Sequence, residues 1–380
     1  MRIHFTAAEA SGDLLGREVI EALRLKAPEM EIAGIGGTEM AAVGVSSSID
    51  LSPLSVIGIV EGIRAYGDVK RLVGEVADAI IAYQPDAAVL IDSWGFTIRL
   101  AKELRRRAPH IRLVKLVGPQ VWASRPGRAK KIAANYDHLL AISPMELPHY
   151  EGTGLTPTVI GAPAMSRSYT GDGPEFRDSH AIAADAPLLL VLPGSRPSEI
   201  RRVAPVLVAA AERCKAAVPA LEVVATPATG VSEAFRAQFG ALDWLRTVDA
   251  GDRRYDAMAA ADVALACSGT VTSEVAIQGT ALVVGYKLGW ITWAILRSGL
   301  YRRKTITMLN IAAGDQQIAP EFIQLDFTPE KLATAVLARL ENPDLATSQV
   351  AAQTEALGLM GFGGRPAAEV AAEAILGDLA

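Results

Sequence analysis

The segment Leu188-Leu-Leu-Val-Leu-Pro-Gly-Ser-Arg-Pro-Ser-Glu-Ile200 lies at the middle of the chain and predicts a strand, a tight turn and a helix in succession. Its five leading apolar residues show no polar alternation, which is typical of a parallel strand buried on both faces. Pro193-Gly194 ends this strand, and the hydroxyl, proline and carboxylate that follow are typical of a helix start. The segment therefore predicts one βα unit of an α/β fold.

The turn of this βα unit is also a candidate phosphate site. A tight glycine turn between a strand and a helix leaves unpaired backbone N–H groups that would point at one spot and attract an anion. Arg196 adds a guanidinium that can hold a phosphate bidentately. An ordinary turn with a surface arginine is the alternative, and this segment by itself leaves both open.

Similar units repeat on both sides of the segment. Short apolar runs separated by helical stretches predict mostly parallel sheets, and we expect an α/β fold with two doubly wound, Rossmann-like domains facing each other across a cleft. Residues 161–187 are rich in Gly, Pro, Ser and Asp and mark the boundary. The predicted parts are an N-terminal domain (1–165), a linker with a short lead-in helix (166–187), a C-terminal domain (188–345), and C-terminal helices (346–380) that pack on the N-terminal domain or on a partner subunit.

Composition narrows the functional classes. With 380 residues, 50% of them hydrophobic and 21% charged, the chain has the composition of a globular two-domain protein. A net charge of −5 disfavours a general nucleic-acid surface. Two cysteines make neither a disulfide framework nor a metal cluster, which suits a reducing cytoplasm. The sequence has no signal-peptide pattern at Met1 and no apolar run long enough to span a membrane. It also has no P-loop pattern. No Gly-x-Gly-x-x-Gly follows the first strand, so nicotinamide or flavin binding is disfavoured.

Three further groups of residues follow predicted strands. Ser268-Gly-Thr270 can present backbone N–H groups to a phosphate, and Glu274 one turn later can accept from a ribose diol or can be a surface glutamate. Asp92 can be a general base or the cap of the next helix. The loop of residues 118–128 combines Trp122 with arginines that can hold an anion, or Trp122 packs on a neighbouring helix.

Taken together, these pieces resemble the lipid-A-disaccharide synthase family of glycosyltransferases. The matching stretches occur in the family's order over nearly the whole chain: Ala8–Gly16, Val56–Glu61, Ile91-Asp92, Pro119–Ala123, Leu192–Arg196 with Glu199, Ser268–Thr270 with Glu274, and Leu309-Asn310. The resemblance implies a GT-B fold and metal-independent transfer with inversion, without a cofactor. It implies UDP-2,3-diacylglucosamine as donor and 2,3-diacylglucosamine 1-phosphate as acceptor, with the β-1,6 disaccharide phosphate and UDP as products.

The resemblance also assigns roles to individual residues. Asp92 corresponds to the base for the acceptor hydroxyl. The nucleotide-sugar site would comprise Gly194, Ser195, Arg196, Ser268, Gly269, Thr270, Glu274 and Asn310. The acceptor site would comprise Glu9, Ser11, Gln120 and Trp122. Because no metal accompanies the donor, backbone N–H groups and a guanidinium must stabilise the charge on the departing UDP.

The chain departs from the family pattern on the acceptor side. The family usually has a proline, an acidic residue and Phe-Asn after the aspartate, whereas this chain has Ser93-Trp-Gly-Phe-Thr97. Ser124 replaces a second tryptophan, and Ala162 replaces a histidine. Two other functions therefore stay open: another UDP-sugar enzyme of this fold, such as an N-acetylglucosamine transferase or a UDP-sugar 2-epimerase, or a divergent protein that binds UDP-sugar or lipid without turnover.

Acylated substrates imply contact with a membrane. The segment Trp290-Ile-Thr-Trp-Ala-Ile-Leu296 is followed by cations, a combination typical of a peripheral anchor. Its predicted membrane contacts are Trp290, Trp293, Arg302 and Arg303, with residues 56–63 as a second candidate. We expect a cytoplasmic protein at the cytoplasmic face of the inner membrane, with the two lipid substrates and that membrane as partners, no nucleic acid, and a homodimer left open.

Overall fold

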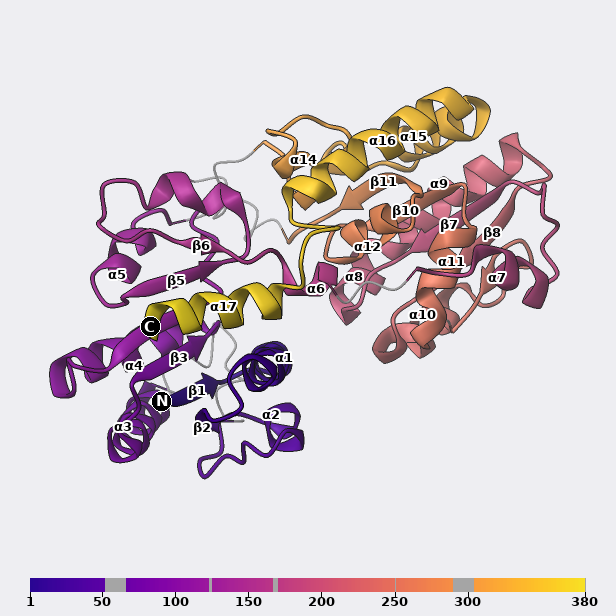
Figure 1. The fold of residues 1–380 in the computed structure, drawn as a ribbon. Coiled ribbons are helices and arrows are strands. Elements are labelled where there is room, and N and C mark those ends of the chain that lie inside the picture. The colour runs from indigo at the N-terminus through magenta and orange to yellow at the C-terminus, as the bar shows by residue number, and fades with distance from the viewer. Residues whose placement is uncertain (52–65, 123–124, 167–169, 250, 290–303, 380) are drawn as a thin grey trace. The chain divides into compact units, whose positions relative to one another are not determined.

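The structure is a computed structural model that describes residues 1–51, 66–122, 125–166, 170–249, 251–289 and 304–379. The chain forms two compact units (Figure 1). Unit 1 comprises Met1–Ser166 and Met360–Ala380, and unit 2 comprises Arg167–Leu359. Among the described residues, no helix is long and apolar enough to cross a membrane. Each unit contains one six-stranded sheet in which all strand pairs are parallel, so the prediction of two doubly wound α/β units is confirmed.

Unit 1 has the strand order β2-β1-β3-β4-β5-β6. Strand β1 pairs with both β2 and β3, so the strand order runs in opposite directions on the two sides of the β1–β3 pair. The elements of unit 1 are β1 (Arg2–Ala7), α1 (Ala10–Lys26), β2 (Glu31–Ile35), α2 (Thr38–Ala42), α3 (Tyr66–Tyr83), β3 (Ala87–Ile91), α4 (Trp94–Arg107), β4 (Arg112–Leu116), α5 (Arg128–Ala133), β5 (His138–Ala141), the 3₁₀ helix η2 (Pro144–His149), β6 (Thr158–Val159), α6 (Pro163–Ser166) and α17 (Ala367–Leu379).

The strands of unit 1 bury both faces. Ala88 and Leu90 of β3 pack toward α3, α4 and α5, whereas Val89 and Ile91 pack toward α1 and α17. This follows from the two-residue period of a strand, which sends successive side chains to opposite faces. Both faces need apolar side chains, which explains the continuous apolar run of residues 87–91.

Unit 2 has the strand order β12-β11-β10-β7-β8-β9. Its strands grow outward from the neighbouring pair β7 and β10, and helices α9 and α15 pack against each other on one face. Its elements are α7 (Gly173–Ser179), β7 (Leu188–Leu192), α8 (Pro197–Arg202), α9 (Ala204–Ala217), β8 (Glu222–Ala225), η3 (Thr229–Val231), α10 (Ser232–Phe239), β9 (Arg246–Thr247), η4 (Gly251–Arg253), α11 (Arg254–Ala260), β10 (Val263–Cys267), α12 (Val271–Ile277), β11 (Ala281–Tyr286), α14 (Met308–Ala312), β12 (Glu321–Ile323), α15 (Pro329–Glu341) and α16 (Pro343–Leu359).

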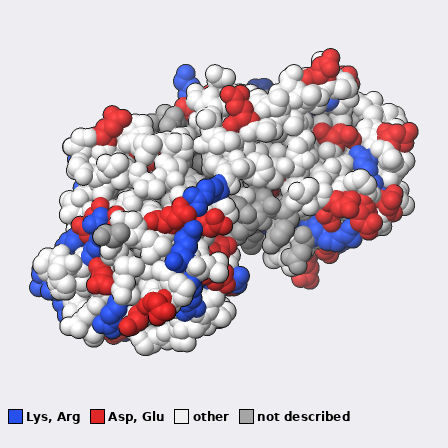
Figure 2. All heavy atoms as spheres, viewed as in Figure 1, with Lys and Arg blue, Asp and Glu red and all other residues white. Residues whose placement is uncertain are grey.

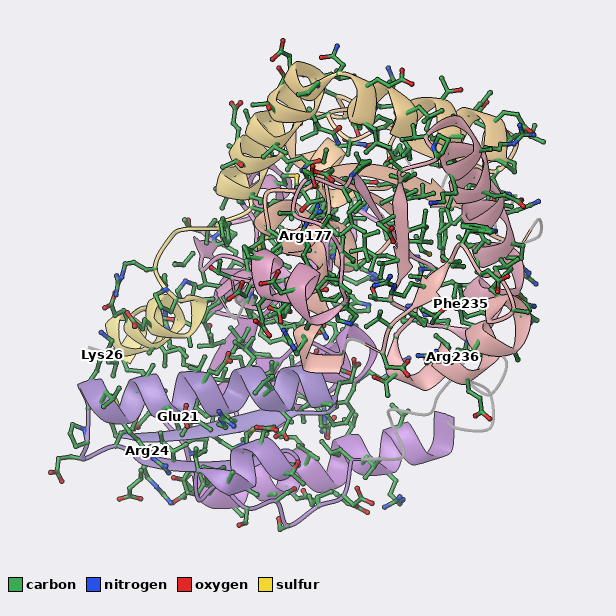
Figure 3. All side chains as sticks on the ribbon, turned by 90° about the vertical axis from the view of Figure 1, so that its right-hand side faces the viewer. Glu21, Arg24, Lys26, Arg177, Phe235 and Arg236 are labelled. Carbon is green, nitrogen blue, oxygen red and sulfur yellow. The ribbon has the colours of Figure 1, made fainter. Side chains whose placement is uncertain are left out.

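The segment 170–187, expected to be a linker, is packed into unit 2. Phe176 of α7 is buried, and Gly173 lies so close to the backbone of Ala259 that a Cβ there would approach its oxygen to 2.7 Å. Arg177 donates to the carbonyl oxygens of Ala260 and Ala186 at 3.0 and 2.8 Å, and its side chain lies within the unit (Figure 3). The segment looked like a linker because it lacks a periodic apolar pattern. Its backbone is nevertheless anchored in unit 2, by Arg177 and by the N–H groups of Gly171 and Asp172, which donate to Gln278 and Asp256 at 2.7 and 2.9 Å.

The C-terminal helices, which the sequence grouped together, belong to different units. Helix α16 contacts α12, α14 and β11 of unit 2, whereas α17 lies along α1 of unit 1 (Figure 1). Lys26 at the end of α1 points toward α17, where its ammonium lies 2.8 Å from the carboxylate of Glu373 (Figure 3). Ile375 is fully buried in the same contact. Unit 1 is therefore built from two separate stretches of the chain.

Candidate active site

A pocket of about 570 Å³ in unit 2 adjoins the carboxyl ends of β7 and β10. These two strands are neighbours at the point where the strand order reverses, and ligands of doubly wound sheets bind outside the carboxyl ends of strands at such points. All the predicted nucleotide-sugar residues except Asn310 line the pocket: Gly194, Ser195, Arg196, Ser268, Gly269, Thr270 and Glu274. The structure thus brings together two loops that are far apart in the sequence.

The turn after β7 differs from expectation, because a carboxylate inside the protein occupies its N–H groups. Oε2 of Glu199 accepts from the backbone N–H groups of Ser195 and Arg196 at 2.8 and 3.1 Å. Glu199 is buried one turn into α8 and folds back over the turn. Gly194 has a φ of +112°, and a Cβ there would lie 2.5 Å from Glu199 Oε2, so this glycine makes room for the carboxylate. For Ser195 and Arg196, the prediction of unpaired N–H groups at this turn is therefore wrong.

The loop after β10 retains the donors that an anion needs. Ser268, Gly269 and Thr270 precede α12, and among the described residues no protein acceptor is found for the N–H groups of Gly269, Thr270 and Val271. Gly269 and Thr270 are exposed at the pocket. Backbone N–H groups at a helix start favour a phosphate oxygen. This loop, together with the Arg196 guanidinium, is thus the better anion-binding part of the pocket.

Arg254 is a pocket residue that the sequence analysis missed. Its guanidinium donates to Glu274 Oε1 at 3.2 Å and to the Tyr255 hydroxyl at 2.8 Å, and it lies 4.7 Å from the Tyr255 ring centroid. Arg254 is the first residue of α11 and lines the pocket. It belongs to no sequence motif from which this position could have been predicted. Only the packing of α11 beside α12 brings it to Glu274.

Asn310 lies elsewhere in unit 2. It is fully buried, its Nδ2 donates to the Ala319 carbonyl at 2.8 Å, and its Oδ1 accepts from the Ala319 N–H at 2.9 Å. Nδ2 also lies 3.2 Å from Glu321 Oε2. The amide therefore holds the segment before β12 in place in this structure. A contact between Asn310 and the donor stays a prediction.

Asp92 lies at the carboxyl end of β3 in unit 1, beside the end of β1. Ala7 pairs with Ile91, so Glu9 and Asp92 follow neighbouring strand ends at the point where this sheet also reverses its order. The N-terminal cap of α4 is Ser93, and no side-chain capping bond is found there. The carboxylate of Asp92 is half-buried and is available for another role than capping the helix.

Buried Lys115 supports the backbone at Asp92. Its ammonium donates to the Asp92 carbonyl oxygen and, at 2.9 Å, to the Thr97 hydroxyl. Thr97 in turn donates to the Asp92 carbonyl at 2.8 Å. Burial lowers the pKa of Lys115 to about 7, although the charges of Asp92 and Glu9 act in the opposite direction. Both carboxylates thus lie within electrostatic reach of one amine. Lys115 could not be predicted as a site residue because it lies within the otherwise apolar end of strand β4.

The other predicted acceptor residues lie in loops of unit 1. Glu9 and Ser11 are exposed at the start of α1, and Gln120 is exposed in the loop after β4. Trp122 keeps only 6% exposure, so most of its ring belongs to the core. The acceptor contacts of these four residues stay predictions. Trp290, Trp293, Arg302 and Arg303, like residues 56–63, lie outside the described residues.

The described residues give little support to a metal site or to a reactive thiol. Among them, no group of three or more His, Cys, Asp or Glu side chains could hold a metal ion. Burial raises the pKa of the Cys267 thiol beside the pocket, which disfavours a thiolate nucleophile. Cations and carboxylates are mixed over the face of the protein shown in Figure 2.

Comparisons with known proteins agree with this geometry. A family model described as lipid-A-disaccharide synthetase matches residues 3–375. The lipid-A-disaccharide synthase of Rhodospirillum centenum is 37% identical over 378 residues, covering 98% of this chain and 94% of the relative. That of Ruegeria pomeroyi is 36% identical over 392 residues, covering 100% of this chain and 96% of the relative.

Solved structures extend the likeness to the fold. The UDP-GlcNAc 2-epimerase of Neisseria meningitidis bound to UDP-GlcNAc has a TM-score of 0.59 at 9% identity, covering 100% of this chain and 99% of that one. The UDP-GlcNAc 2-epimerase of Methanocaldococcus jannaschii in complex with UDP-GlcNAc and UDP has a TM-score of 0.56 at 12% identity, covering 99% of both chains. These likenesses agree with two Rossmann-like units of the GT-B type. The near-complete family match shows that the chain belongs to the lipid-A-disaccharide synthetase family, and it is a glycosyltransferase.

Proposed function

We propose that the enzyme transfers diacylglucosamine from UDP-2,3-diacylglucosamine to the 6-hydroxyl of 2,3-diacylglucosamine 1-phosphate. The observation that carries this proposal is the pocket at β7 and β10, where two loops with phosphate-binding chemistry converge. Unit 2 would hold the UDP of the donor, and unit 1 would hold the acceptor. The products are the β-1,6 disaccharide 1-phosphate and UDP.

On the donor side, the pocket would stabilise the charge of the departing UDP. The N–H groups of the loop after β10 would donate hydrogen bonds to the phosphate oxygens, and the Arg196 guanidinium would bind two phosphate oxygens at once. Glu274, oriented by Arg254, would accept hydrogen bonds from the ribose hydroxyls. When the bond from the anomeric carbon to the UDP oxygen breaks, UDP takes the electron pair, so these donors stabilise the transition state more than the ground state.

On the acceptor side, Asp92 would act as the general base. As the acceptor oxygen forms its bond to the anomeric carbon, on the face opposite UDP, the Asp92 carboxylate would receive the hydroxyl proton. Lys115 and Thr97 hold the Asp92 carbonyl and so fix the direction of the carboxylate without occupying it. Lys115 is therefore a positioning residue in this mechanism.

A product assay tests the function. Purified enzyme is supplied with the phosphorylated acceptor and either UDP-2,3-diacylglucosamine or UDP-N-acetylglucosamine, and products are identified by mass. We expect the disaccharide phosphate from the acylated donor only, and the same rate in excess EDTA. Transfer of the unacylated sugar, epimerisation at its C2, or no product above background would contradict the proposal.

We also infer that the enzyme works at the cytoplasmic face of the inner membrane, because both substrates carry acyl chains. The candidate anchor is the segment with Trp290 and Trp293 and the cations Arg302 and Arg303. The protein should sediment with anionic vesicles, and Trp290→Ser with Trp293→Ser should abolish this while UDP affinity stays unchanged. Sedimentation of the double variant like the wild type would point to residues 56–63 instead. Light scattering would show whether the chain also pairs with a second copy.

A further inference from the structure

An arginine is held against an aromatic ring two residues from the candidate base. The guanidinium carbon of Arg128, the first residue of α5, lies 5.1 Å from the ring centroid of Trp94, the first residue of α4. The two helices follow β4 and β3, which are neighbouring parallel strands, so both begin at the same edge of the sheet. Asp92 lies at that edge as well, two residues before Trp94. Stacking on the ring holds the guanidinium at this edge of the sheet.

A second arginine reinforces the charge at this place. Burial lowers the pKa of Arg128, and the charge of Arg125 lowers it further, so the two guanidiniums lie within electrostatic reach of each other. Within the part of the chain that the structure describes, neither of them forms an ion pair with a carboxylate. By contrast, Arg106 on the neighbouring α4 is paired with Glu103 at 2.6 Å. Two like charges without a counter-charge repel each other, and an anion between them removes that repulsion.

The departure from the family pattern at residues 93–97 acts at the same place. Where the family usually has an acidic residue after the aspartate, this chain has Gly95, which is exposed one residue after Trp94. The chain thus has no carboxylate at the residue after Trp94, and in Trp94 it has an aromatic ring on which the Arg128 guanidinium stacks. Both changes leave the positive charge more available to a ligand.

We propose that Arg128, held by Trp94 and assisted by Arg125, binds the phosphate monoester of the acceptor. This rests on the proposed function. The acceptor carries its phosphate on C1 and its reactive 6-hydroxyl on the carbon attached to C5, and C1 and C5 flank the ring oxygen, so a phosphate site is needed within one sugar's length of the base. Arg128 offers a planar fork that matches two phosphate oxygens. Binding there would set the acceptor with its 6-hydroxyl toward Asp92.

The test compares two acceptors in neutral detergent micelles with saturating UDP-2,3-diacylglucosamine. One is 2,3-diacylglucosamine 1-phosphate, and the other is the methyl glycoside of 2,3-diacylglucosamine, which lacks the phosphate. Arg128→Ala should raise KM for the phosphorylated acceptor by about 10- to 100-fold, the usual effect of losing a charge-assisted contact. KM for the methyl glycoside should not change. The matched control is Arg106→Ala, which removes the same charge from α4 and should change neither KM.

Two further variants keep the test decisive if Arg128→Ala does not fold. Arg128→Lys keeps the charge without the fork and should give a smaller loss that is again confined to the phosphorylated acceptor. Gly95→Asp restores a carboxylate; a Cβ at Gly95 meets only Arg99 Nη1 at 3.8 Å, so the side chain fits, and the same selective rise in KM is expected. Equal changes for both acceptors, or none, would overturn the proposal.

Two other outcomes would identify a different ligand for the arginines or a different function for the enzyme. If Arg128→Ala is silent in micelles and loses activity only on anionic vesicles, the guanidiniums bind phospholipid headgroups and the acceptor-phosphate assignment is wrong. If the wild type gives no product with either acceptor while it still binds UDP, the proposed function itself fails, and this is recognised before any variant is compared.

Discussion

Asp92 has a backbone conformation that few non-glycine residues adopt. Its φ is +41°, and that of Ser93 is +39°. Asp and Asn are the side chains best tolerated there, so Asp92→Asn should keep the fold. The bonds from Lys115 and Thr97 go to the Asp92 carbonyl and survive the change. We expect turnover to fall by about two to four orders of magnitude with unchanged UDP affinity and unfolding midpoint. Wild-type turnover in Asp92→Asn would refute the assignment of the base.

Lys115 should make stability depend on pH in a defined window. The pKa of this lysine is about 7 in the folded protein, below its ordinary 10.5. Between these values the unfolded chain binds more protons than the folded one, so the folded state gains stability as pH rises. Relative to Lys115→Met, which cannot titrate, the wild type should gain about 2 kcal/mol between pH 7 and 9. Urea unfolding of both proteins at the two pH values measures this, and a constant difference would contradict it.

The sequence predicted Asp92 but could not predict Lys115. An aspartate directly after a buried apolar run lies at a sheet edge whatever the tertiary details. A lysine within such a run reads as the exposed member of an alternating strand. Only the structure shows that this lysine is buried and that the Thr97 hydroxyl and the Asp92 carbonyl accept hydrogen bonds from its ammonium. Arg254 was missed for the same reason, since its partner Glu274 lies on another helix.

At the scale of elements, the turn from β7 to α8 separates two kinds of anion contact. Glu199 occupies the backbone N–H groups of Ser195 and Arg196 and also pairs with Arg196 Nη1 at 3.1 Å. Arg196 can therefore offer the donor the remaining N–H groups of its exposed guanidinium but not its backbone. Arg196→Ala should therefore weaken UDP binding by about 10- to 100-fold and leave uridine binding unchanged. Calorimetry with both ligands measures this. Arg201→Ala, on the exposed side of the same helix, is the control. An equal loss for uridine would place Arg196 on the nucleoside instead.

The start of α11 gives a second prediction at this scale. If Arg254 orients Glu274 toward the ribose, Arg254→Ala should weaken the binding of UDP by a larger factor than the binding of 2′-deoxy-UDP. The deoxy ligand lacks one of the hydroxyls from which the Glu274 carboxylate would accept a hydrogen bond. A difference of about threefold to tenfold is the size expected for one hydrogen bond. Equal losses for the two nucleotides would show that Arg254 contacts the phosphates directly.

The strands and helices could be predicted from the sequence, but which groups bind the backbone N–H groups of the turns could not. Buried strands such as residues 87–91 and 188–192 are apolar on both faces, which allows little besides a parallel sheet between helices. The turn after β7 had the residues of a phosphate loop, but a carboxylate four residues later competes for the same N–H groups. Sequence spacing shows that Glu199 can reach the turn, and it does not show whether a ligand or this side chain occupies it.

At the scale of the whole molecule, the chain returns to unit 1 after completing unit 2. Segments before and after the pocket-bearing unit therefore fold together, with α17 closing the apolar face of β1 and β3. The sequence predicted helices over residues 346–380 but not this division, since α16 and α17 both contain several alanines and neither shows which unit it packs on. Polar contacts specify the docking of α17: Asp378 accepts from Arg112 at 2.8 Å and is bonded to the ring of His138.

This division predicts that two helices adjacent in sequence stabilise different units. Leu357 in α16 and Ile375 in α17 are both buried, with 1% and 0% exposure. Either change to alanine should cost about 2–5 kcal/mol by leaving a cavity. Hydrogen exchange followed by mass spectrometry should show faster exchange in peptides of β3 for Ile375→Ala, and in peptides of β10 for Leu357→Ala. Saturating UDP should restore protection at β10 only, because its pocket is built wholly from unit 2. Faster exchange in the same peptides for both variants would show that the two units unfold as one.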